Sequence, residues 1–150
     1  MKILVVAVGR ARPGPERALW EEFSGRLDWP IRLVEVESKK AGPGLKDREA
    51  ELLLQAVPDA ALLVALDERG KALSSPDLAR QLGRWQDQGT GTLAFVIGGA
   101  DGLAEPVRAK ARLVLSLGPM TWPHMLVRGL LAEQLYRAER ILQGHPYHRQ

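Results

Sequence analysis

Two short apolar segments, each running into a loop rich in glycine or proline, constrain the fold of this chain most. Residues 93–97 precede the glycine turn 98–102, and residues 113–117 precede the loop 118–123. Apolar segments of this length, bounded by turn residues, are typical of strands buried on both faces of a sheet. In open α/β sheets, ligands bind beyond the carboxyl ends of such strands. The two segments therefore predict strand ends that border a ligand-binding crevice.

The same alternation of strand and helix patterns extends along the whole chain. Strands are predicted at residues 2–8, 31–36 and 60–66, the second with the partial alternation of an edge strand. A polar turn, 67–71, follows the third strand. Helical spacing predicts helices at about 15–25, 46–57, 76–88, 104–111 and 124–142. Ser75 is expected to cap the third helix, with Pro76 at its first position.

The order of these elements predicts the fold class. Strands that alternate with helices favour an α/β fold, with an open, mostly parallel sheet and helices on both faces. At 150 residues, and with no interdomain linker or repeat, residues 1–150 are expected to form a single domain.

The composition limits the chemistry that the chain can perform. The absence of cysteine excludes disulfides and thiolate metal sites. The three histidines, at positions 124, 145 and 148, have no metal-binding spacing to carboxylates, so no metal is expected. The first strand leads into the sequence GRARPG rather than GxGxxG, and there is neither a GxxxxGK[S/T] loop nor a serine in a nucleophile elbow. These absences disfavour a dinucleotide-binding Rossmann domain and a P-loop NTPase.

No segment of the sequence has the properties of a membrane span or a secretion signal. No apolar stretch approaches the roughly 20 residues of a transmembrane helix. The apolar N-terminal segment is short, is followed by Arg10 and Arg12, and lacks a small-residue cleavage site. We therefore expect no membrane association and a cytoplasmic location.

The net charge of +3 is unevenly distributed. From Arg108 onward there are seven Lys and Arg residues against two acidic residues, Glu133 and Glu139. A basic C-terminal face would suit an anionic partner such as RNA, although a solubilising helix surface explains it equally well. The loop 38–46, with Lys39 and Lys40, is open to the same two readings, solvated loop or RNA contact.

A pocket of apolar and main-chain groups is predicted where Leu66, Gly98 and residues 117–122 meet at the strand ends. Apolar walls can grip a flat base, and main-chain groups can hydrogen-bond its edge. Such a pocket suits an adenosine-containing cofactor. The glycine turn by itself would serve equally as an ordinary tight turn.

Motifs along almost the full length give the chain a specific resemblance. They are VVAVG (5–9), LD with GK and SS (66–75), FVIGGADGL (95–103), MTWPH with Arg128 (120–128), EQLYRA (133–138) and HPYH (145–148). In this order, they resemble the bacterial large-subunit rRNA pseudouridine N3-methyltransferases, small members of the SPOUT (trefoil-knotted) methyltransferases. Trp122 stands where Phe or Leu is usual in that family, and residues 11–29 match only loosely.

The resemblance implies a fold, a cofactor, a substrate and an assembly. The C-terminal part would form a trefoil knot, the cofactor would be S-adenosyl-methionine, and the protein would be a homodimer. The methyl group would go to N3 of a pseudouridine in 23S rRNA, with the assembled ribosome as the substrate. Carried over position by position, the cofactor contacts fall on Leu66, Gly98, Leu117, Gly118, Pro119, Met120, Thr121 and Trp122.

Few side chains of this sequence could assist methyl transfer. With the family in view, we expect Tyr147 and His148 of one subunit, with Arg149, to reach the cofactor pocket of the other subunit. Arg128 and Arg137 would hold RNA phosphate or polarise the base. His124 is a further candidate for handling the proton of N3. Each of these residues also has a purely structural explanation, such as a frayed end or a helix surface.

Three other functions remain open at this point. One is a SPOUT methyltransferase that acts on tRNA, which the lack of a separate RNA-binding domain disfavours. Another is a non-catalytic RNA-binding or ribosome-binding module, which would not bind S-adenosyl-methionine saturably. The third is an unknotted, flavodoxin-like nucleotide-binding domain, which would copurify with a different ligand.

Overall fold

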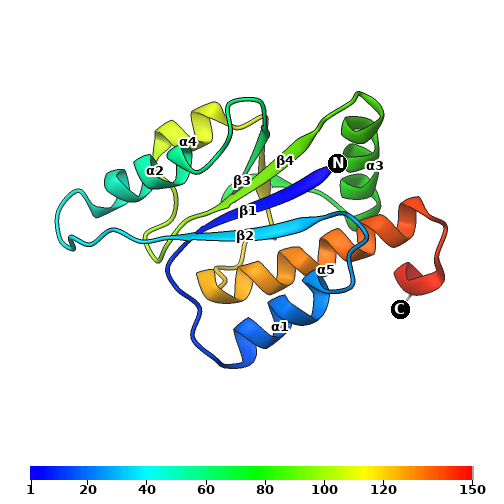
Figure 1. The fold of residues 1–150 in the computed structure, drawn as a ribbon, viewed down its shortest axis with the longest axis horizontal. Helices are drawn as coiled ribbons and strands as arrows, with labels where there is room; N and C mark the ends of the chain where they lie inside the picture. Colours follow the sequence, from blue (N-terminus) through cyan, green and yellow to red (C-terminus); the bar gives the residue numbers. More distant parts are fainter. Residues whose placement is uncertain (150) are drawn as a thin grey trace.

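A five-stranded, all-parallel sheet lies between two layers of helices in the computed structural model, which describes the backbone of residues 1–149 and the side chains of residues 1–147 (Figure 1). The strands are β1 (Lys2–Val8), β2 (Ile31–Val36), β3 (Leu62–Ala72), β4 (Thr92–Ile97) and β5 (Leu113–Ser116). The helices are α1 (Pro15–Ser24), α2 (Leu45–Gln55), α3 (Ser75–Asp87), α4 (Glu105–Lys110) and α5 (His124–Leu142), followed by a 3₁₀ turn, η1 (Pro146–Arg149). The predicted α/β fold is confirmed.

The sheet order is β2-β1-β4-β3-β5, which places β1, β4 and β3 inside. In β4, Phe95 packs in the core on the α3 and α5 side, and Val96 packs in the core on the α2 and α4 side. Both side chains are fully buried, as predicted for this strand. The same prediction is wrong for the beginning of β5, where Leu113 and Val114 are only partly buried, because β5 is an edge strand paired with β3 alone.

Strand β3 is longer than its apolar pattern indicates, because it continues through the predicted polar turn. Its pairing with β5 is interrupted between Leu66 and Lys71. Within this irregular stretch, a Cβ added to Gly70 would lie 2.5 Å from the carbonyl oxygen of Val114, so only glycine fits. The stretch that leaves the regular ladder, Asp67–Arg69, lies at the edge of the sheet where the predicted site is located.

Helix α3 begins one residue earlier than predicted. Ser74, rather than Ser75, is its N-cap, and the Ser74 hydroxyl accepts a hydrogen bond from the backbone N–H of Asp77 at 3.2 Å. The hydroxyl of Ser75 instead contacts Gln134 Oε1 of α5 at 2.6 Å. The tertiary contact with α5 therefore uses the serine that the local pattern had assigned to the cap.

Helix α5 packs beside α1 on the same face of the sheet (Figure 1). The two helices approach closely at Gly129, where an added Cβ would lie 2.6 Å from the Leu19 side chain. With 19 residues, α5 is about 28 Å long. It starts near the carboxyl ends of the strands, and η1, which follows it, lies on the side where β1 begins (Figure 1).

Candidate active site

A pocket of about 430 Å³ opens at the carboxyl ends of β3, β4 and β5. This volume lies in the range of small-molecule and cofactor sites. Its apolar lining comes from the three strands, from the loop after β5 and from α5, at Leu66, Ile97, Leu115, Leu117 and Val127. Because β3 lies between β4 and β5, the ends of all three strands meet at the pocket, as expected from Leu66, Gly98 and residues 117–122.

Seven of the eight predicted cofactor residues line this pocket: Leu66, Gly98, Leu117, Gly118, Met120, Thr121 and Trp122. The eighth, Pro119, is in the same loop but is not among the lining residues. Lining residues outside the predicted cofactor set include Lys46, Asp67, Asp101 and His124. The strand-end rule could have found Asp67, which directly follows Leu66, whereas Lys46 lies on α2 and no local motif marks it.

The glycine loop after β4 forms the floor of the pocket by a tight backbone turn. Gly99 and Gly102 form an isolated antiparallel bridge, and the Gly102 N–H donates to the Gly99 carbonyl at 3.0 Å. Gly102 has φ of 79°, in the left-handed region that favours glycine. A Cβ on Gly98 would lie 2.6 Å from the carbonyl oxygen of Gly102. The loop is therefore closed so tightly that position 98 has no room for a side chain.

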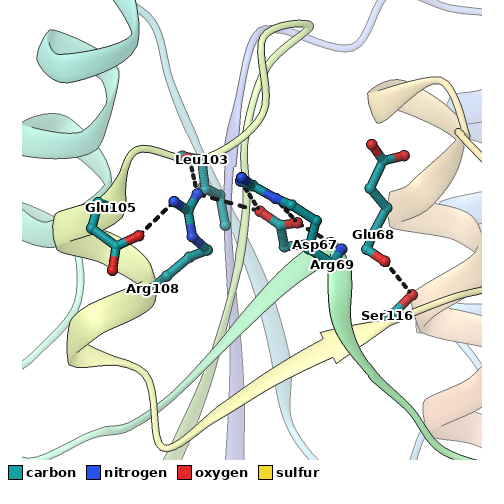
Figure 2. Close-up of polar contacts among 7 residues, drawn as sticks. All are labelled: Asp67, Glu68, Arg69, Leu103, Glu105, Arg108 and Ser116. Atoms are coloured by element: carbon teal, nitrogen blue, oxygen red, sulfur yellow. Dashed lines mark hydrogen bonds and ion pairs between the residues drawn. The ribbon is translucent and has the colours of Figure 1, made fainter. Parts of the chain in front are cut away.

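The loop after β5 is tied to the irregular stretch of β3. The Ser116 hydroxyl lies 3.1 Å from the Glu68 carbonyl oxygen (Figure 2) and accepts from the Gly118 N–H at 3.1 Å. The Thr121 hydroxyl donates to the Glu68 carboxylate at 2.8 Å. On either side of Thr121, Met120 is 71% exposed and Trp122 is 41% exposed. The loop thus offers fixed main-chain groups and two uncovered apolar side chains at the pocket mouth.

A buried carboxylate organises the opposite rim of the pocket. Figure 2 shows Asp67 between the guanidinium groups of Arg69 and Arg108, and its side chain is only 6% exposed. Arg108 also bonds the Leu103 carbonyl and the Glu105 carboxylate, which joins α4 to the network. Burial raises the pKa of Asp67, but the hydrogen bonds from Arg69 and the two positive charges outweigh it, so the pKa lies below its ordinary value. Asp67 is therefore ionised at neutral pH and holds the rim together.

His124, in the first turn of α5, is the only imidazole among the described residues that line the pocket. Burial lowers its pKa below 6.5, and the nearby charge of Arg128 lowers it further. The ring is therefore neutral at pH 7. A neutral imidazole at this place can accept either a hydrogen bond or a proton from a bound ligand.

Arg128 is buried, in contrast to the phosphate-holding role predicted from the sequence. It is 1% exposed, forms an ion pair with Glu35 at 2.6 Å, and donates to the Gly9 carbonyl at 2.8 Å and the Val8 carbonyl at 3.1 Å. It thereby fastens α5 to the ends of β1 and β2. A guanidinium enclosed in this way gives solvent-borne phosphate no access, and its role in this geometry is to position α5.

Arg137 and Tyr147 lie in a second group at the other end of α5. The Arg137 guanidinium pairs with Glu133 and lies 5.1 Å from the centre of the Tyr147 ring. The Tyr147 hydroxyl is 3.2 Å from Glu133 Oε1, and burial followed by the charge of Glu133 raises the pKa of the phenol. The predicted contact of the His148 side chain lies outside the described side chains.

A second hollow, of about 570 Å³, lies beside the first pocket. It shares Leu115, Leu117, Gly118 and Trp122 with the first pocket. Its other end is lined by Glu133, Gln134 and Arg137. The predicted cofactor residues Leu117, Gly118 and Trp122 thus line the same hollow as Arg137, although Tyr147 is not among its lining residues.

Two other kinds of feature are absent from the part of the chain that the structure describes. No group of three or more His, Asp or Glu side chains there is arranged to hold a metal ion. None of the helices in that part is both long and apolar enough to cross a membrane.

Comparisons with known proteins agree with this geometry. A family model described as "Predicted SPOUT methyltransferase" matches residues 1–148. Proteins named ribosomal RNA large subunit methyltransferase H from Rhodospirillum centenum and Paramagnetospirillum magneticum are 65% and 56% identical to the chain, with 99% of each chain covered. Among solved structures, the S-adenosyl methionine complex of ribosomal RNA small subunit methyltransferase E from Neisseria gonorrhoeae has a TM-score of 0.54 at 12% identity, over 95% of this chain and 66% of the other.

Proposed function

Because this chain belongs to the SPOUT methyltransferase family, we propose that it transfers the methyl group of S-adenosyl-methionine to N3 of a pseudouridine in 23S rRNA. The observation that carries the proposal is the pocket at the ends of β3, β4 and β5, which seven of the eight expected cofactor residues line. Relatives whose match covers 99% of their length are named as methyltransferases of the large-subunit rRNA, which supports 23S rRNA as the substrate.

The residues of the pocket fit the cofactor chemically. Leu66, Ile97 and Leu117 supply apolar walls for a base, and the closed loops around Gly98 and Gly118 bring main-chain groups to its edges. When bound, S-adenosyl-methionine supplies an already activated methyl group on a sulfonium. The protein must therefore mainly orient the two reactants, exclude water and manage one proton.

The proton on N3 of pseudouridine is weakly acidic, and a nearby neutral base would help to remove it. We assign this role to His124, which is neutral at pH 7 and lines the pocket. Arg137, and Tyr147 and His148 of the second subunit, would polarise the base or hold the adjacent phosphate. Arg128, being buried, acts by holding the start of α5 in place.

The proposed enzyme is a homodimer with each site shared between two subunits. Helix α5 is about 28 Å long and separates His124 from the tail. Tyr147 packs on Tyr136, with 4.7 Å between the two ring centroids. In this position Tyr147 does not reach the pocket of its own chain. The depression beside Trp122 offers a surface for a second copy. A C-terminal trefoil knot and a cytoplasmic location complete the proposal, both expected from the family.

The test is methyl transfer from labelled S-adenosyl-methionine to ribosomes that lack the modification, with free 23S rRNA and tRNA in parallel. We expect label on a pseudouridine of the large subunit, identified by nuclease digestion and mass spectrometry, and more label on ribosomes than on free rRNA. Label on tRNA alone would contradict the substrate. Absence of saturable cofactor binding by calorimetry would contradict the methyltransferase and favour a binding module.

A further inference from the structure

The basic residues of the C-terminal third are largely neutralised within the fold. Four of the six Lys and Arg residues from Arg108 onward whose side chains are described form ion pairs, namely Arg108, Arg128, Arg137 and Arg140. Their partners come from α5 itself and from elements far away in the sequence, such as Asp67 and Glu35. The charge excess that the sequence shows in this third therefore does not form a free basic face.

A group of cations with weak partners or none is found in the loops that follow β1 and β2 and at the start of α2. Residues 9–15 and 37–46 contain five Lys and Arg residues against a single carboxylate, Glu37. Within the described part of the chain, no hydrogen bond or ion pair engages the side chains of Arg12, Lys39, Lys40 or Lys46. Arg10 has only a 3.5 Å contact with Glu37, and at 79% exposure such a pair is weak.

The topology brings these loops to the same edge as the pocket. The loops start side by side, because the Gly9 N–H donates to the Val36 carbonyl at 2.8 Å and the Ala11 N–H donates to Glu35 at 2.6 Å. Strand β1 also pairs with β4, whose end forms the pocket wall, and neighbouring strands are about 4.8 Å apart. Lys46, in the first turn of α2, lines the pocket itself. The cations thus continue from the outer loops into the pocket.

Arg48 gives the second loop a defined shape. Its guanidinium donates to the carbonyl oxygens of Lys40 at 2.7 Å and Pro43 at 2.8 Å. The Arg48 guanidinium is thus engaged by carbonyl groups of the loop, while the Lys39 and Lys40 side chains stay exposed. The two lysines are therefore displayed on a braced segment, which lowers the entropy lost when a partner binds.

We propose that Arg10, Arg12, Lys39, Lys40 and Lys46 form a carboxyl-edge basic surface that binds the phosphates of the RNA strand whose nucleotide enters the pocket. The identification of the partner as RNA rests on the proposed function. The physical argument is that cations with weak partners or none beside a pocket neutralise phosphates at little loss of internal ion pairs, and each contact releases counterions. The strand is held by its backbone here, and the base is selected in the pocket.

The experiment uses full-length protein carrying Lys39→Glu and Lys40→Glu together. Its matched control carries Lys110→Glu and Arg112→Glu, which make the same change of charge on two exposed cations. These two residues precede β5, at the amino ends of the strands and so at the end of the sheet away from the pocket. Binding to protein-free 23S rRNA and to ribosomes is measured by filter binding over a salt series. Cofactor affinity is measured by calorimetry, and thermal melting checks the fold.

We expect the loop variant to bind both RNA and ribosomes about tenfold more weakly or worse, with the slope of log K against log salt reduced by about 1 to 2. Its cofactor affinity and melting temperature should equal those of the wild type, and the control should bind RNA nearly normally. Equal losses in both variants would overturn the proposal, as would a loss on ribosomes that free rRNA does not show. If the wild-type protein binds rRNA through this surface but methylates neither substrate, the proposed function fails while this inference holds.

Discussion

Gly98 is the residue whose identity the pocket constrains most, because an added Cβ would overlap the backbone of Gly102 rather than a movable side chain. We predict that Gly98→Ala forces the loop 98–102 apart and weakens cofactor binding at least about tenfold, as observed for small misplacements of positioning groups. Calorimetry with S-adenosyl-methionine measures this. Gly91→Ala is the control, since a Cβ there meets nothing within 4 Å and Gly91 has no positive φ. Equal affinity for the two variants would refute the prediction.

His124 carries a prediction about pH. Burial and Arg128 lower its pKa, so the neutral form predominates at pH 7 and the rate of methyl transfer should fall only as acid protonates the ring. Replacing it by Asn should lower the rate about 100-fold and remove that acidic limb, while cofactor affinity changes little. The measurement is a pH–rate profile under single-turnover conditions. An unchanged profile in the variant would exclude His124 as the proton acceptor.

The ion pair of Arg128 with Glu35 predicts how stability depends on pH. Burial raises the pKa of Glu35, but the Ala11 N–H and the Arg128 guanidinium lower it more, so the folded pKa lies below the ordinary value of 4.5. A carboxylate with a lowered pKa stabilises the fold fully above its unfolded pKa and loses that contribution as the pH falls through the folded pKa.

We therefore predict that Glu35→Gln lowers the free energy of unfolding by about 1–3 kcal/mol at pH 7, where Arg128 loses its charged partner. Urea denaturation at pH 7 and at pH 3 measures the difference in the free energy of unfolding between variant and wild type. The difference should narrow at the lower pH. A difference that stays constant over this range would show that the carboxylate charge is not what stabilises this contact.

Among the helices, α3 shows most clearly how local and tertiary signals compete. Both Ser74 and Ser75 suit an N-cap, and Ser75 is drawn to Gln134 of α5. We predict that Ser74→Ala removes the cap and lowers the free energy of unfolding by about 1 kcal/mol, as measured by urea denaturation. Ser24→Ala, at the end of α1, is the control and should change stability by less. If Ser74→Ala is neutral, the cap contributes nothing in solution.

The strand β3 shows the same competition in a sheet. Its apolar pattern ends at Leu66, yet the strand resumes pairing at Lys71, because Gly70 lets β5 approach closely. The interruption places Asp67 and Glu68 at the pocket, where one forms the buried network with Arg108 and the other anchors Thr121. An element boundary that looks like a simple turn in sequence therefore supplies two of the side chains that shape the site.

At the scale of the whole molecule, the length of α5 predicts that activity requires two subunits. Deleting residues 146–150 should abolish methyl transfer while leaving cofactor binding intact, since the pocket lies at the far end of α5. Mixing the deletion variant with Gly98→Ala should restore roughly a quarter of the wild-type activity, because half of all dimers are mixed and each mixed dimer carries one site, out of two, in which both parts are intact. Failure of the mixture to recover activity, with mixed dimers confirmed by native mass spectrometry, would place the tail in its own subunit's site.

The sequence by itself determined the fold class, most element boundaries and seven of the eight strand-end residues that were expected at the pocket. Apolar runs such as 93–97 bury themselves in any compact arrangement, and a parallel sheet places its glycine loops at one edge, so local pattern is enough for these. The resemblance of the motifs supplied the cofactor and the substrate.

Only the tertiary structure decided which charges are free. Arg128 looks in sequence like any helix-surface arginine, but burial beside β1 and the approach of Glu35 make it a structural residue. Four of the six described Lys and Arg side chains near the C-terminus form ion pairs, whereas the loops after β1 and β2 carry a group of cations with weak partners or none. Ion pairs join residues far apart in the chain, so their existence follows from packing, which a local pattern does not encode.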